Sequence, residues 1–146
     1  MLTVSRSRFV RGLLLAGALM AGAVAQAQEA VKVVYHLSDG IAQASRAIQN
    51  IRNHMAADSQ AKIVVVTHGA GIDFLLEGAV TPANQPFSGS VADLASKGVE
   101  FRVCNNTLVS RNIDPGKLLM ETKVVPSGVA EVARLQAREG FVYLRP

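Results

Sequence analysis

Short β-branched runs alternate with longer stretches of helical period along most of this chain. The runs at residues 31–37 (VKVVYHL) and 61–66 (AKIVVV) predict strands, and the second is typical of a strand covered on both faces. Between them, apolar residues recur at spacings of three and four: Ile41, Ala44, Ile48, Ile51 and Met55. This spacing predicts a helix that ends near Asp58.

The second half of the chain repeats this alternation with shorter elements. We expect two helical turns at 72–78, an irregular loop at 81–89, a helix at 91–96, a strand at 99–103, a helical stretch to about Asn112, a strand at 123–125, a helix capped by Ser127 that runs through Ala137, and a strand at 141–144. Strands that alternate with helices indicate βαβ units. The pattern therefore predicts an α/β fold, a three-layer α/β/α arrangement around a mostly parallel five-stranded sheet.

The first 27 residues have the pattern of an export signal. Three arginines make a positive start: Arg6, Arg8 and Arg11. The uncharged run that follows, 12–24, has 13 residues, which is shorter than the roughly 20 that span a bilayer core. Alanines meet the A-x-A rule in two overlapping frames, so we expect cleavage after Ala25 or Ala27. These features predict a signal peptide at 1–27, a periplasmic or secreted mature chain, and no stable membrane insertion after cleavage.

Removal of this leader changes the meaning of the chain's charge. Three of the 15 Lys and Arg residues leave with the leader, and the remaining 12 face 11 Asp and Glu residues, a net charge of +1. No basic cluster remains, which excludes nucleic-acid binding as a function class. Residues 28–146 are enough for one hydrophobic core, so we expect a single domain.

The candidate site residues follow the strands of the predicted sheet, because ligands of parallel sheets bind beyond the carboxyl ends of the strands. They are His68, Gly69, Gly71, Cys104, Asn105 and Ser127. Cys104 is the single cysteine, so it cannot form a disulfide within one chain and is structural, reactive or intermolecular. At the start of a helix, N–H groups would lower the pKa of a thiol that is partly reachable by solvent. The alternative is a thiol packed beneath the rim.

The histidines and the glycine turn allow more than one interpretation. His68 could pair with Cys104 or with a bound anion, or be a hydrogen-bonded residue of the rim. The turn at 69–71 could bind an anion on its backbone N–H groups. His36 is interpreted as packed or facing another subunit, and His54 as solvated. Because the three histidines and the cysteine lack regular ligand spacing, no metal site and no cofactor are predicted.

Four segments carry a resemblance to a known family across nearly the whole mature chain. They are VVYHLSDG, KIVVVTHGAGIDFLL, KGVEFRVCNNTL with Arg111 beyond it, and VVPSGVAEVARLQ through to the closing YLRP. The chain resembles the DsrE/DsrF-like sulfur-relay family, and within it an exported DsrE-like subgroup. The resemblance implies a DsrEFH-like fold and a homo-oligomer, a trimer or a hexamer. It also implies that Cys104, which precedes Arg111 at the end of the third strand, receives sulfur as a persulfide. Asn112 stands where the family usually has glycine.

Two function classes remain open from the sequence. The first is a sulfur carrier or sulfurtransferase-like protein in which Cys104 holds a persulfide and exchanges sulfur with a donor or acceptor protein. His68, Asn105 and Ser127 would be its polar neighbours. The second is a noncatalytic module of the same fold that binds a small anion or a protein partner at the rim. A hydrolase is not supported, because Ser127 lacks the flanking turn that such enzymes use.

Overall fold

The structure is a computed structural model that describes residues 29–146, so the predicted signal peptide lies outside the described residues. Its elements are β1 (Lys32–Leu37), α1 (Ile41–Ala57), β2 (Lys62–Thr67), the 3-10 helix η1 (Gly69–Leu75), α2 (Phe87–Ser96), β3 (Glu100–Cys104), α3 (Asn105–Ser110), the 3-10 turn η2 (Pro115–Lys117), β4 (Thr122–Val125), α4 (Gly128–Glu139) and β5 (Val142–Leu144). Within the described range, no helix has both the length and the apolar character needed to cross a membrane.

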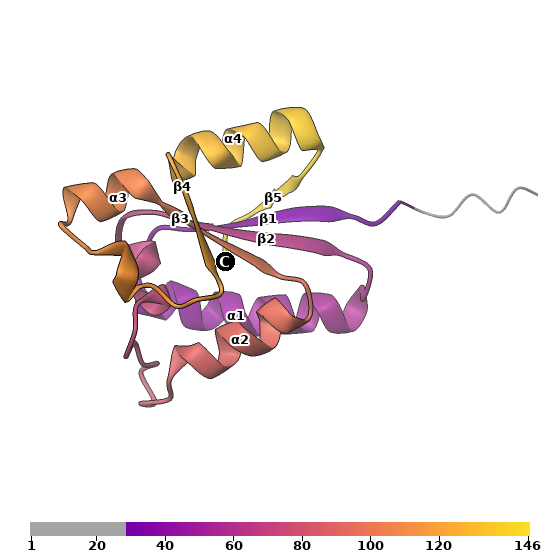
Figure 1. The fold of residues 1–146 in the computed structure, drawn as a ribbon. Coiled ribbons are helices and arrows are strands. Elements are labelled where there is room, and N and C mark those ends of the chain that lie inside the picture. The colour runs from indigo at the N-terminus through magenta and orange to yellow at the C-terminus, as the bar shows by residue number, and fades with distance from the viewer. Residues whose placement is uncertain (1–28) are drawn as a thin grey trace, which may run out of the picture.

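The five strands form one sheet in the order β4-β3-β2-β1-β5, and every neighbouring pair is parallel. Helices α1 and α2 cover one face of the sheet, and α4 covers the other (Figure 1). The predicted α/β fold with five strands and helices on both faces is confirmed, and the sheet is wholly rather than mostly parallel. Because all strands run the same way, their carboxyl ends meet at one edge of the sheet.

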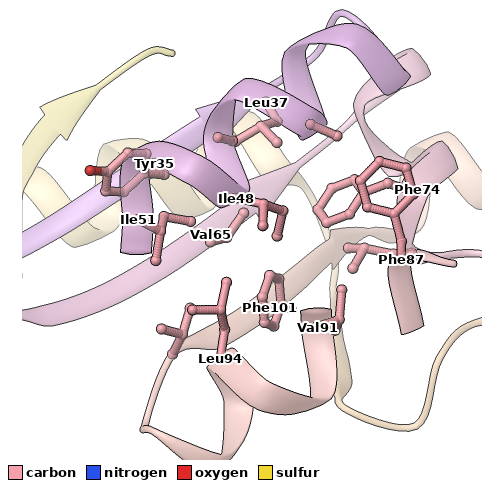
Figure 2. Close-up of a cluster of buried hydrophobic side chains, with 14 of the residues drawn as sticks. Tyr35, Leu37, Ile48, Ile51, Val65, Phe74, Phe87, Val91, Leu94 and Phe101 are labelled. Atoms are coloured by element: carbon pink, nitrogen blue, oxygen red, sulfur yellow. The ribbon is translucent and has the colours of Figure 1, made fainter. Parts of the chain in front are cut away.

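Apolar side chains on the two faces of the sheet account for this layering. On the face covered by α1 and α2, the Phe74 ring packs edge to face on Phe87 and Phe101, with centroid distances of 5.5 and 6.3 Å (Figure 2). On the other face, α4 brings Val132 and Leu135 onto valines of the two central strands: Val34, Val64 and Val66. The alternation of side chains along each strand thus divides the core into two layers.

η1 differs from the two helical turns expected at residues 72–78. It begins earlier, at Gly69, and winds as a 3-10 helix. A Cβ atom on Gly71 would lie 2.2 Å from the Leu37 carbonyl oxygen, so this turn presses directly against the end of β1. Short 3-10 pieces are common as tight connectors, and this close approach leaves room only for glycine.

α2 begins earlier than expected, at Phe87, inside the segment 81–89 that the prolines marked as an irregular loop. Phe87 is buried in the core against Phe74. Pro86, directly before it, has the extended backbone angles that suit the residue ahead of a helix. Packing of one aromatic ring therefore starts the helix where the local sequence favours a turn.

Ion pairs fix α4 over the sheet. The Glu131 carboxylate on α4 accepts hydrogen bonds from Arg134 at 2.8 and 3.0 Å and from Arg102 on β3. The hydrogen bonds from Arg134, helped by those from Arg102, outweigh the opposing effect of burial and lower the pKa of Glu131 to about 2. This cluster holds α4 over β3, and it thereby determines where the first residue of the helix, Gly128, lies.

Glu131→Gln is expected to lower the free energy of unfolding by about 1–3 kcal/mol at neutral pH, because it removes the charge from these hydrogen bonds. The folded-state pKa of Glu131 lies below its ordinary value of 4.5, so the carboxylate stabilises the fold above that pH and loses this contribution as pH falls toward about 2. The difference between wild type and variant should therefore shrink over this range. Urea unfolding at several pH values measures it, with Glu77→Gln at an exposed glutamate as the control. An effect of Glu131→Gln that is equal at every pH would contradict the assignment.

Candidate functional site

The carboxyl ends of β1, β2 and β3 bring three polar side chains to one face of the sheet. Cys104 is the last residue of β3, and the register of β2 with β3 places His68 beside it. His36 on β1 pairs with Val66, which lies two residues before His68 and packs on the α4 side. Residues two apart in extended chain share a face, so all three side chains are on the face covered by α4.

Cys104 lies at the rim, as expected, but only 4% of its surface is exposed, so the expectation that solvent partly reaches it is wrong. The groups that favour the thiolate of Cys104 are the backbone N–H groups of Asn106, Thr107 and Gly128 and the Thr107 hydroxyl, which could donate hydrogen bonds to it. Burial raises the pKa of the thiol, but the hydrogen bonds outweigh it and hold the pKa below its ordinary value. The sulfur therefore lies between the first turns of α3 and α4, and its pKa shifts in the direction expected from the sequence.

Gly128 lets α4 begin in contact with the rim. A Cβ atom at this position would lie 3.1 Å from the Thr67 carbonyl oxygen and 3.2 Å from the Cβ atoms of both Cys104 and His68. A glycine brings its N–H close to the sulfur without displacing these neighbours. The preceding residue, Ser127, caps α4 by accepting a hydrogen bond from a backbone N–H of the first turn at 3.3 Å. Its expected role as a helix cap is confirmed, and a role in binding stays a prediction.

Thr107 joins the thiol to the turn that follows β2. Its hydroxyl oxygen accepts a hydrogen bond from the Gly69 N–H at 2.9 Å, so the hydroxyl hydrogen is free to donate to Cys104. The Arg111 guanidinium donates to the Gly69 carbonyl at 3.0 Å and pairs with Asp73 at 2.6 Å. Arg111 thus ties this turn to α3 from the surface.

The N–H groups of the glycine turn have partners within the fold. Gly69 donates to Thr107, and Gly71 donates to the His68 carbonyl at 3.0 Å. An anion cradle needs unpaired N–H groups, so the hydrogen bonding gives no support to the interpretation of these two glycines as an anion site. Asn105 is the first residue of α3 and is half-buried at the rim.

The structure pairs His68 with a second histidine. Its Nε2 atom lies 2.6 Å from Nε2 of His36, and Nδ1 of His36 lies 2.8 Å from the Tyr143 hydroxyl on β5. Burial, with the neighbouring charges of His68 and Arg145, holds the pKa of His36 below its ordinary value. From the sequence, His36 was expected to be packed or subunit-facing, and Tyr143 was not expected at the site. The sequence did contain one signal for this pair, because the two histidines stand near the ends of two consecutive predicted strands.

The arrangement offers a nucleophile and the groups that stabilise its charge. A thiol with a lowered pKa supplies thiolate, which attacks electrophilic sulfur. The surrounding N–H groups stabilise negative charge on the sulfur before attack and again when it leaves. Within residues 29–146, no group of three or more His, Cys, Asp or Glu side chains is placed to hold a metal ion.

A wholly parallel five-stranded sheet with one buried thiol at its carboxyl rim defines the protein as a small α/β protein with a single-cysteine site. The chain belongs to the DsrE/DsrF-like family, whose model matches residues 15–145. The family resemblance of the sequence is thus confirmed, and the exported subgroup stays a prediction.

Two solved structures are similar to the chain. The protein of unknown function MTH1491 from Methanobacterium thermoautotrophicum is 35% identical, with a TM-score of 0.70, and the match covers 80% of this chain and 99% of that one. The ychN protein from E. coli is 12% identical, with a TM-score of 0.64 and coverage of 82% and 100%, which shows a shared fold alone. No curated protein matches the chain.

Thr107→Val should raise the pKa of the Cys104 thiol, because it removes a hydroxyl donor from the thiolate at nearly constant size. The rate of alkylation by iodoacetamide should then rise with pH about one unit later than in wild type, as expected for the loss of one hydrogen bond to a charged group. Thr107→Ser keeps the hydroxyl and should keep the wild-type profile. Coincident profiles for Thr107→Val and wild type would mean that the hydroxyl does not stabilise the thiolate.

Proposed function

We propose that the protein is a sulfur carrier in which Cys104 holds a persulfide. The observation that carries this proposal is the position of Cys104 at the end of β3, directly before α3 and against Gly128 of α4, where N–H groups favour the thiolate. Membership of the DsrE/DsrF-like family supports sulfur relay as the broad activity. The export predicted from the leader would place this activity outside the cytoplasm.

The transfer step follows from thiol chemistry. The Cys104 thiolate attacks the outer sulfur of a persulfide donor, R–S–SH, and a new S–S bond forms as the donor's S–S bond breaks. The electron pair of the broken bond leaves on R–S⁻, and Cys104 becomes the persulfide. An acceptor thiolate later attacks the outer sulfur, and Cys104 leaves as thiolate. A thiolate stabilised by hydrogen bonds is a good leaving group, so the site favours release as well as loading.

The burial of the thiol favours a second candidate function. A sulfur that is 4% exposed can serve packing alone, in which case the protein is a noncatalytic module that binds a small anion or a protein partner. The two functions differ in one property, because only a carrier must open its rim far enough for a donor to reach Cys104. α3, which directly follows Cys104, is a short helix of six residues with an exposed side chain at Val109, and it is the element whose movement would open this rim.

Wild-type protein treated with glutathione persulfide should gain the mass of one sulfur atom, and reduction should remove it. Cys104→Ser and Cys104→Ala should gain none while keeping the circular dichroism spectrum of the wild type. Intact-mass spectrometry measures both. If the wild type gains no sulfur, although its thiol reacts once denaturant opens the fold, the noncatalytic module is the better account.

We also propose that the protein forms a homo-oligomer, a trimer or a hexamer, through the β4 edge of its sheet. Apolar side chains on β4 or just before it are exposed: Val124 (39%) and Met120 (92%). An open strand edge with apolar side chains is a favourable contact for another copy.

Light scattering should report more than one subunit, and Val124→Lys should lower the subunit number. Gln49→Lys on the exposed face of α1 is the control, and Val142→Lys tests the opposite edge strand, where Val142 is also exposed. A wild-type monomer at micromolar concentration, or a subunit number lowered by Val142→Lys alone, would contradict the proposal.

A further inference from the structure

Four polar side chains form a row across the carboxyl end of the sheet, on the face covered by α4. In the order of the strands they are Tyr143 on β5, His36 on β1, His68 after β2 and Cys104 on β3. Hydrogen bonds of 2.8 and 2.6 Å join the first three. His68 and Cys104 follow paired residues of β2 and β3, so they are neighbours. The Cβ atoms of both residues lie 3.2 Å from the position that a Cβ atom on Gly128 would occupy.

The hydrogen bonds of this row are consistent with a single chain of proton donors. If the Tyr143 hydroxyl donates to Nδ1 of His36, the proton of neutral His36 is on Nε2 and donates to Nε2 of His68. Because Nε2 of His68 is then the acceptor, Nδ1 is the ring nitrogen of His68 that can hold a proton to donate. Each member can give up one proton and receive another, which is the requirement for a relay.

Burial and the charges around His36 lower its pKa and favour its neutral form. The groups that face His36 are His68 at the end of β2, Arg145 and Tyr143 on and after β5, and Asp39 after β1. Arg145 is paired with Asp39 at 2.7 and 2.9 Å, and the two charges act on the pKa of His36 in opposite directions. Burial is the largest cause of the lowered pKa of His36. A neutral imidazole can both accept and donate a proton, whereas an imidazolium only donates.

We propose that His68 is the general acid of the Cys104 reaction and that His36 and Tyr143 resupply its proton. This inference rests on the proposed function as a sulfur carrier. When Cys104 takes the outer sulfur of R–S–SH, the leaving R–S⁻ receives the proton from Nδ1 of His68. Nε2 of His68 takes the Nε2 proton of His36, and Nδ1 of His36 takes the hydroxyl proton of Tyr143. Water then restores the proton of Tyr143, which is 37% exposed.

A general acid matters most for a donor whose leaving thiol has a high pKa, since a thiolate of low pKa leaves without help. His68→Gln should therefore slow sulfur transfer from glutathione persulfide about 10²-fold, the usual size of a general-acid contribution. Its reaction with a disulfide that releases an aromatic thiol of low pKa should keep the wild-type rate. His36→Gln and Tyr143→Phe should slow only the glutathione persulfide reaction, by a smaller factor.

His54→Gln is the matched control, because His54 is hydrogen-bonded to Tyr35 at 3.0 Å on the opposite face of the sheet. The sequence had predicted a solvated His54 instead. This variant should keep both rates. If the wild-type protein accepts no sulfur, both the carrier function and the proton relay are wrong. If the wild-type protein accepts sulfur, but no faster than His68→Gln does, only the proton relay is wrong. Equal slowing of both reactions in His68→Gln also overturns the relay, since it would show that His68 only supports the fold around Cys104.

Discussion

The contact of Gly128 with the ends of β2 and β3 is the constraint on which the rest of the site depends. Because Gly128 has no side chain, the first turn of α4 rests directly against Cys104 and His68. The contact buries the thiol and directs a backbone N–H at its sulfur. The hydrogen bonds between Glu131 and Arg102 hold α4 in this position over β3. The missing side chain of Gly128 and the half-buried Arg102–Glu131 ion pair therefore determine together what surrounds the cysteine.

Two opposing effects meet at the Cys104 sulfur. Burial favours the neutral thiol, and the donors from Thr107, Gly128 and Asn106 favour the thiolate, with the donors prevailing. These donors replace the water that would solvate an exposed thiolate, while the closed rim keeps oxidants away from it. Lower basicity also makes the sulfur a weaker nucleophile and a better leaving group. Such a balance suits reversible transfer between partners more than permanent capture.

The strands were predictable because each one carries its own local signal. The apolar runs at 31–37 and 61–66 identify two central strands, and the rule for parallel sheets then locates Cys104 at the rim. The burial of Cys104 was not predictable, because it depends on Gly128 packing over it from a distant part of the chain. The partners of His36 were not predictable either, because they also come from distant parts of the chain. Its partners become visible only when β1 is known to lie between β2 and β5.

The row of polar side chains is assembled from the two ends of the folded domain. His36 and Tyr143 are 107 residues apart in the chain, and β5, which carries Tyr143, is the last strand to be synthesised. Pairing between segments so far apart is slow, because the chain must close a long loop before any contact forms. β2, β3 and α3 are all made before this strand. The row of polar side chains is therefore complete only after the C-terminal strand has paired with β1.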